Sequence, residues 1–158
     1  MDVIVLAYTA DGRDPLLDAP RQYGLSQMHK HLPEMAAVCG LQYPPVFCPI
    51  VAPYYAGMEV TVPLTPAETG ASMEQIREIY RDYYRTGLVS FRDAPDESGF
   101  LSAGSMAGRD DMEISVFGQE DRILLVSRFD NLGKGASGAA IQNMNLALGL
   151  DEAEGLVR

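Results

Sequence analysis

The chain has 158 residues and a formal net charge of −10, from 12 basic and 22 acidic side chains. Nucleic acids and anionic membranes bind basic surfaces, so this charge argues against both as partners. No apolar run reaches the roughly 18 residues of a membrane span, and the first residues lack the basic flank of a signal peptide. We expect one cytoplasmic domain over residues 1–158.

The first third of the chain is mostly loop-like, with two short predicted elements. Residues 3–8 form an apolar run that predicts a strand. Residues 31–39 are predicted to form a helix, because Pro33 and Glu34 suit its first turn and Gly40 suits its end. Four prolines between residues 43 and 55 favour an extended segment over a helix.

The middle of the chain predicts a strand followed by a helix. Apolar and other residues alternate over Met58–Leu64, as in a strand with one buried face. Ser72 and Gln75 form a capping box at the start of a helix predicted over Ser72–Thr86. Gly87 ends this helix, and a short strand is expected over Leu88–Arg92.

A hairpin and a last helix complete the predicted fold. Met112–Phe117 and Arg122–Phe129 are strands joined by a four-residue turn, and the second should be central because four consecutive residues are apolar. The last helix, over about residues 136–148, has a face of small and apolar side chains. The order of elements predicts an α+β fold, with a mostly antiparallel sheet and helices packed on one face.

The chain's two histidines, His29 and His31, lie together just before the predicted helix at 31–39. With Glu34 they could bind a metal ion or transfer protons near neutral pH. The spacing is not that of a zinc signature. An exposed polar start of the helix is the plainer interpretation of the same residues.

A loop with three glycines follows the predicted strand that ends at Phe129. It contains Asn131, Gly133 and Lys134, and it lacks the spacing of a phosphate-binding P-loop. A tight turn that lets a helix pack closely is about as good an explanation as a ligand-binding loop. Cys39 and Cys48 are expected to be small buried residues, with a reactive thiol at Cys39 as the lesser alternative.

Two segments, residues 29–35 and 130–145, resemble the C-terminal half of N-acetyl-gamma-glutamyl-phosphate reductase. Residues 17–25, 57–64 and 108–114 are similar to further segments of that family. The resemblance covers nearly all of the chain from about Asp14.

The resemblance implies an activity and a fold. Enzymes of this family use NADPH to reduce N-acetyl-glutamyl 5-phosphate, an acyl phosphate, to the semialdehyde in arginine biosynthesis. They combine an NADP-binding Rossmann domain with a C-terminal domain like that of glyceraldehyde-3-phosphate dehydrogenase. The implied partners are this small-molecule substrate and further copies of the chain.

The resemblance also implies roles for individual residues. His29 matches the family's acid–base histidine. The residues implied to bind or orient the substrate are His31, Glu34 and Lys134. Asn131 and Gly133 lie in the loop implied to approach the cofactor.

The chain departs from the family pattern in two ways. It contains neither the Gly-Cys-Tyr/Phe segment of the nucleophilic cysteine nor the glycine fingerprint for a dinucleotide. The expectation is therefore a C-terminal domain without its cofactor domain, inactive by itself. Two alternatives stay open: a non-catalytic oligomerisation or binding module with the same fold, and a metal-binding domain at His29, His31 and Glu34.

Overall fold

The computed structural model describes residues 11–95 and 97–158, so the strand predicted at residues 3–8 lies outside the described residues. The chain divides into two compact units, Met1–Tyr55 and Ala56–Arg158. No described helix is both long and apolar enough to cross a lipid bilayer.

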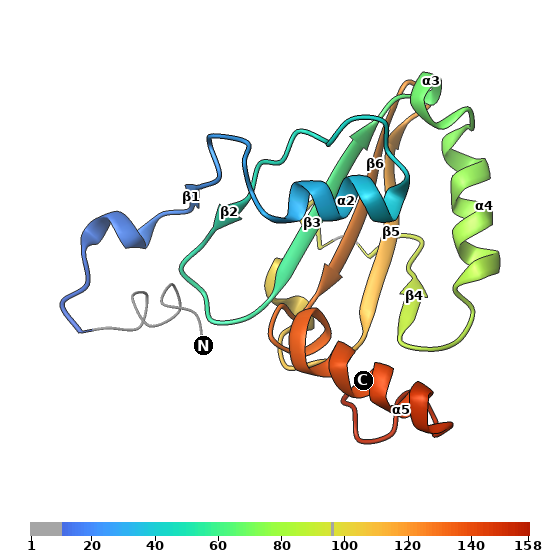
Figure 1. Ribbon diagram of the computed structural model, residues 1–158. Helices are drawn as coiled ribbons and strands as arrows, with labels where there is room; N and C mark the ends of the chain where they lie inside the picture. Colours follow the sequence, from blue (N-terminus) through green and yellow to red (C-terminus); the bar gives the residue numbers. More distant parts are fainter. Residues whose placement is uncertain (1–10, 96) are drawn as a thin grey trace. The chain divides into compact units, whose positions relative to one another are not determined.

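The first unit is a short ladder and a helix. A 3₁₀ turn, η1 (Pro15–Asp18), precedes β1 (Arg21–Gln22), which pairs in antiparallel fashion with β2 (Ile50–Val51) (Figure 1). Helix α2 (His31–Cys39) has the predicted bounds, and Gly40 ends it in the left-handed conformation with φ 63°. Leu32 is the only buried apolar side chain among the residues described in this unit.

The second unit is built on a four-stranded sheet in the order β3-β6-β5-β4 (Figure 1). Its strands are β3 (Met58–Leu64), β4 (Val89–Phe91), β5 (Met112–Gln119) and β6 (Arg122–Phe129). β6 lies in the centre, antiparallel to β3 and to β5, while β4 is parallel to β5. The prediction of an α+β fold with a mostly antiparallel sheet is confirmed, as is the central place of β6.

Helices and turns flank this sheet. Helix α4 (Met73–Tyr83) begins at the predicted capping box and ends three residues earlier than predicted, because Tyr84 leaves the helical conformation. The short helices α3 (Pro66–Thr69) and η2 (Ala103–Met106) lie before and after α4 along the chain. A π-helical turn, η3 (Gly133–Ser137), leads into α5 (Gly138–Leu148).

The core lies between α4 and one face of the sheet. Ile76 of α4 packs with Val116 of β5 and Ile123 of β6, and Tyr80 and Leu125 pack against this group. Val116 and Ile123 are fully buried. The apolar positions of β5 and β6 therefore fix the sheet against α4 by removing apolar surface from water.

Arg128 of β6 is buried on the opposite face of the sheet, with only 5% of the residue exposed. Its guanidinium donates to Glu97 at 2.9 Å, to Glu113 at 3.1 Å and to the carbonyl of Ser102 at 3.2 Å. A buried cation is tolerated when it is paired and hydrogen-bonded in this way.

We expect Arg128→Leu to lower the free energy of unfolding by roughly 3 kcal/mol, because it leaves the partly buried Glu113 beside fewer cationic partners. Urea unfolding measures the change. Arg122→Leu on the same strand is the control, since Arg122 pairs with Asp121 at an exposed site and such pairs contribute at most about 1 kcal/mol. Equal losses in both variants would contradict the assigned role.

Candidate active site

Both histidines lie in a cluster of rings in the first unit. The centroid of the His29 ring is 4.9 Å from that of His31, 5.1 Å from that of Phe47 and 5.9 Å from that of Tyr23. His29 precedes α2 and is half-buried, while His31 is the first residue of the helix and is exposed. The two histidines, which are close in the sequence, thus also have their rings side by side in the structure.

Glu34 fixes the orientation of the His31 ring. Oε2 of Glu34 accepts a hydrogen bond from Nδ1 of His31 at 2.6 Å, across one turn of α2. This bond holds the pKa of Glu34 below its ordinary value against the opposing effect of desolvation, and the charges of His31, Lys30 and His29 add to it. With the proton on Nδ1, the Nε2 atom of neutral His31 carries a lone pair and can accept a proton.

His29 is held in the opposite sense. Its Nδ1 accepts a hydrogen bond of 3.3 Å from the backbone N–H of His31. Neutral His29 therefore carries its proton on Nε2 and presents a hydrogen-bond donor there. In their neutral forms the two adjacent imidazoles thus combine a hydrogen-bond donor, Nε2–H of His29, with a proton acceptor, Nε2 of His31.

Asp130 organises the end of β6 in the second unit. The residue is only 3% exposed, and its carboxylate accepts hydrogen bonds from the backbone N–H groups of Gly108, Leu132 and Gly133. Burial alone would raise the pKa of Asp130, but these three donors together outweigh it and lower the pKa.

Asn131 follows Asp130 and ties the loop to the start of β3. Its Oδ1 accepts a hydrogen bond of 2.9 Å from the backbone N–H of Gly57. Gly57 has φ 117°, and a Cβ there would lie 2.2 Å from the carbonyl oxygen of Ala103. Only glycine allows this approach, and the Asn131 amide oxygen is consequently engaged within the unit.

The glycines that follow are explained by close packing within the unit. A Cβ on Gly133 would lie 2.4 Å from the carbonyl oxygen of Arg109, and one on Gly138 would lie 2.3 Å from Oδ1 of Asp110. Of the two explanations left open by the sequence, tight packing accounts for both positions. Gly133 also donates its N–H to Asp130 and accepts from the N–H of Gly138.

Lys134 is held by α5. Its ammonium group donates to Oε1 of Gln142, and Nε2 of Gln142 donates to Glu152 at 2.9 Å.

Of the site residues predicted from the sequence, the structure brings His29, His31 and Glu34 together in the first unit. The other predicted site residues, Asn131, Gly133 and Lys134, lie along one loop of the second.

Sequence reasoning missed the aromatic partners of His29. Tyr23 and Phe47 lie six residues before it and 18 residues after it, and no periodic pattern links the three positions.

The expectation that both cysteines are buried was wrong. Cys39 ends α2 and Cys48 lies in an extended segment, and both are exposed.

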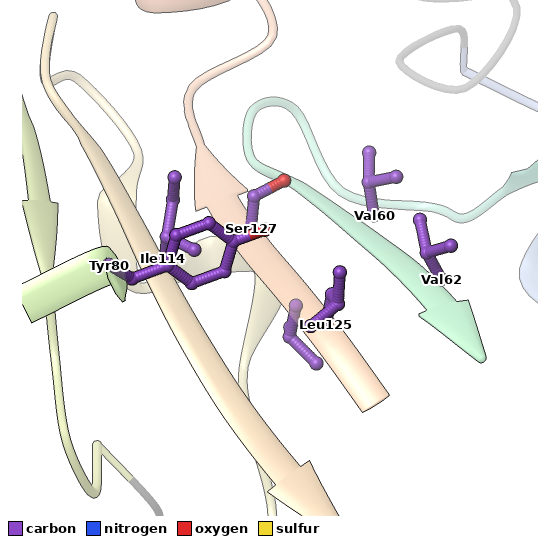
Figure 2. Close-up of a pocket in the computed structure, with 7 residues that line it drawn as sticks. Val60, Val62, Tyr80, Ile114, Leu125 and Ser127 are labelled. Carbon is purple, nitrogen blue, oxygen red and sulfur yellow. The ribbon is translucent and has the colours of Figure 1, made fainter. Parts of the chain in front are cut away.

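The described part of the chain offers neither a metal site nor a charged pocket elsewhere. No group of three or more His, Cys, Asp or Glu side chains there is placed to hold a metal ion, so the metal-binding alternative gains no support. Figure 2 shows a hollow on the α4 face of the sheet, lined by apolar side chains such as Val60, Val62 and Leu125 together with Tyr80 and Ser127. It contains no charged side chain that could transfer a proton.

Residues 13–131 match the family model described as the semialdehyde dehydrogenase dimerisation domain. The chain belongs to this family. The matched residues extend over parts of both units and include α2 of the first and the whole sheet of the second.

Curated proteins named as N-acetyl-gamma-glutamyl-phosphate reductases are similar to this chain. The chain is 40% identical over 144 residues to N-acetyl-gamma-glutamyl-phosphate reductase 2 of Nostoc sp., covering 85% of the chain and 45% of that protein. It is 44% identical over 135 residues to the N-acetyl-gamma-glutamyl-phosphate reductase of Brucella anthropi, covering 80% of the chain and 43% of that protein. The chain thus spans less than half the length of these relatives.

A solved structure resembles part of the chain. Aspartate semialdehyde dehydrogenase II from Vibrio cholerae superposes with a TM-score of 0.47 at 20% identity, over 64% of this chain and 30% of that one.

We expect Asp130→Asn to lower the free energy of unfolding at pH 7 by about 1–3 kcal/mol, because the amide loses one oxygen acceptor and opposes a donor. The pKa of Asp130 is lowered on folding, so its contribution is complete above about pH 4 and is lost as the pH falls further. Urea unfolding between pH 3 and pH 7 should therefore show the difference between the two proteins shrinking at low pH. Asp121→Asn at the exposed hairpin turn is the control, and a pH-independent difference would contradict this account.

Proposed function

We propose that the chain is the dimerisation-domain part of an NADP-dependent reductase, which converts N-acetyl-glutamyl 5-phosphate to N-acetyl-glutamate 5-semialdehyde in arginine biosynthesis. The observation that carries this proposal is the pair of imidazoles with opposite hydrogen-bonding roles, found in a chain 40–44% identical to proteins named as this reductase. A cytoplasmic location goes with such a role.

Proton transfer can enter this reaction at two points, when the thiol loses its proton to become a thiolate and when negative charge develops on an oxygen of the reacting group. A thiolate adds to the acyl carbon, the bond to the phosphate oxygen breaks, and a thioester forms. When NADPH is bound it supplies the hydride that reduces the thioester carbon. The carbon–sulfur bond then breaks, and the aldehyde and a thiolate are released.

We assign the acid–base role to His29. In the neutral ring its Nε2–H can donate a hydrogen bond that stabilises an oxygen of the reacting group. To take the proton of the thiol, Nε2 must instead carry the lone pair, so the ring would exchange its bond from the His31 N–H for a proton on Nδ1. The imidazolium formed in this way could then protonate an oxygen of the reacting group. We assign neither Cys39 nor Cys48 as the nucleophile. In this proposal the thiol and most of the cofactor site lie outside this chain.

His31 and Glu34 are proposed to bind the substrate and to orient His29. The support is their short hydrogen bond and the backbone N–H of His31 on Nδ1 of His29. Lys134 is proposed to bind an anionic group of the substrate. To do so its ammonium would exchange the neutral oxygen of Gln142 for a negatively charged one, which is the stronger acceptor.

Asn131 and Gly133 are proposed to contribute to the cofactor site. Because the Asn131 oxygen accepts from Gly57, its NH₂ group is the part of the amide that could donate to a ligand. The residues therefore fit a group that offers a hydrogen-bond acceptor, such as the carboxamide oxygen of a nicotinamide.

We expect His29→Asn to lower kcat of the whole reductase that carries this domain by roughly 10²–10⁴-fold, because a positioned acid–base group contributes about that much. The rate of NADPH oxidation with the acyl phosphate measures it. Lys30→Gln, between the two histidines, should leave kcat within about twofold. The 158-residue chain alone should show no turnover. Normal turnover in the His29→Asn enzyme would sink the proposal.

A second candidate is a non-catalytic oligomerisation module, favoured by the family's description as a dimerisation domain. Both candidates include self-association.

We expect the chain to sediment as a homo-oligomer at micromolar concentrations. A monomer at every concentration tested would show that this chain does not assemble by itself.

A further inference from the structure

The side chain of Gln27 forms a link that the sequence did not suggest. Its Nε2 donates to the carbonyl oxygen of Phe47 at 2.7 Å, and its Oε1 accepts from the backbone N–H of Phe47 at 2.9 Å. One side-chain amide thus satisfies both backbone groups of a residue 20 positions away, as a neighbouring strand would.

This link continues the small ladder of the first unit. β1 and β2 pair through Gln22 and Ile50, and the backbone N–H of Tyr23 then donates to the carbonyl of Pro49 at 3.0 Å. Beyond Tyr23 the backbone turns away, and the Gln27 amide supplies the next pair of hydrogen bonds to the segment that leads into β2.

The backbone of Gln27 is held in an unfavourable conformation to make this link. Its φ is 54°, in the left-handed region that long side chains rarely adopt. Its N–H closes a turn onto the carbonyl of Gly24 at 3.0 Å, and its Nε2 also lies 3.3 Å from that oxygen. The turn places the Gln27 amide beside the backbone of Phe47.

The link holds the surroundings of His29 in place. Gln27 lies two residues before His29, and its partner Phe47 has its ring 5.1 Å from the His29 ring. Met28, which lies between Gln27 and His29 in the sequence, is 85% exposed and cannot hold this segment in place by burial. The position of Phe47 against His29 therefore depends on the Gln27 amide.

We propose that Gln27 is a positioning residue for His29. Its amide fixes Phe47 against the imidazole, which keeps Nδ1 of His29 on the N–H of His31 and leaves Nε2–H as the donor. The effect of Gln27 on catalysis rests on the acid–base role of His29 proposed above. Its effect on the position and tautomer of the His29 ring does not.

Two substitutions separate the hydrogen bonds from the size of the side chain. Gln27→Glu keeps the shape but replaces the N–H₂ donor by an acceptor that faces the carbonyl of Phe47. Gln27→Met keeps a similar length without either hydrogen bond or a new charge. Gln119→Glu is the matched control, because it makes the same chemical change at the exposed end of β5 in the second unit.

The first measurement is nitrogen and proton NMR of the histidine rings in the 158-residue chain at a pH where both imidazoles are neutral. In the unaltered chain we expect nuclear Overhauser contacts between the rings of His29 and Phe47, and a proton on Nε2 of His29. Both Gln27 variants should lose the contacts and give a mixture of tautomers, and Gln119→Glu should change neither. Unchanged His29 signals in folded Gln27→Glu and Gln27→Met would overturn the proposal, even if both unfold more easily.

The second measurement is steady-state kinetics of the whole reductase with the same three substitutions. We expect kcat to fall roughly tenfold or more in both Gln27 variants with little change in KM, because a small displacement of a catalytic group is costly. Altered His29 signals with unchanged kcat would overturn the catalytic part of the proposal. If His29→Asn also kept normal turnover, the proposed function would fail, and the NMR result would still decide the geometry.

Discussion

The carboxylate of Asp130 determines how the second unit is put together. It ends the central strand β6 and accepts hydrogen bonds from three backbone N–H groups, one of them on Gly108 and two in the loop that follows the strand. Of the residues that supply these donors, Gly108 is exposed and Leu132 and Gly133 are partly buried, and a hydrogen bond from each N–H to the charged carboxylate contributes up to about 3 kcal/mol. By satisfying them, Asp130 sets the direction in which the chain leaves the sheet toward η3 and α5, and it fixes Asn131 beside the start of β3.

The glycines of this loop follow from the same constraint. Because Asp130 draws the loop close to the segment that holds Gly108, the backbone at Gly133 and Gly138 passes within contact distance of Arg109 and Asp110. No Cβ fits there. A cluster of glycines beside a lysine therefore arises here from the chain's own packing, and a ligand is not required to explain it.

Local signals in the sequence predicted most of the fold. The capping box at Ser72, Gly40 after α2 and the alternation over Met58–Leu64 act within a few residues, so helix and strand bounds came out close to the structure. The parallel pairing of β4 with β5 was not predictable, because it depends on a connection of 20 residues with no periodic pattern. The pairing of His29 with His31 was visible in the sequence, whereas the link from Gln27 to Phe47 depends on a turn with a left-handed glutamine.

The two units keep their polar groups in place by different means. In the second unit, apolar packing of Ile76, Val116 and Ile123 supports the sheet, and Asp130 and Arg128 are ordered because they are buried and fully partnered. In the first unit, Leu32 alone is buried among the described apolar residues, so packing cannot fix an imidazole there. The orientation of His29 must come from individual contacts: the N–H of His31, the rings beside it and the Gln27 amide that holds one of those rings. The proton transfer proposed for His29 depends on the direction of a single nitrogen, and these few contacts are therefore what that proposed chemistry requires.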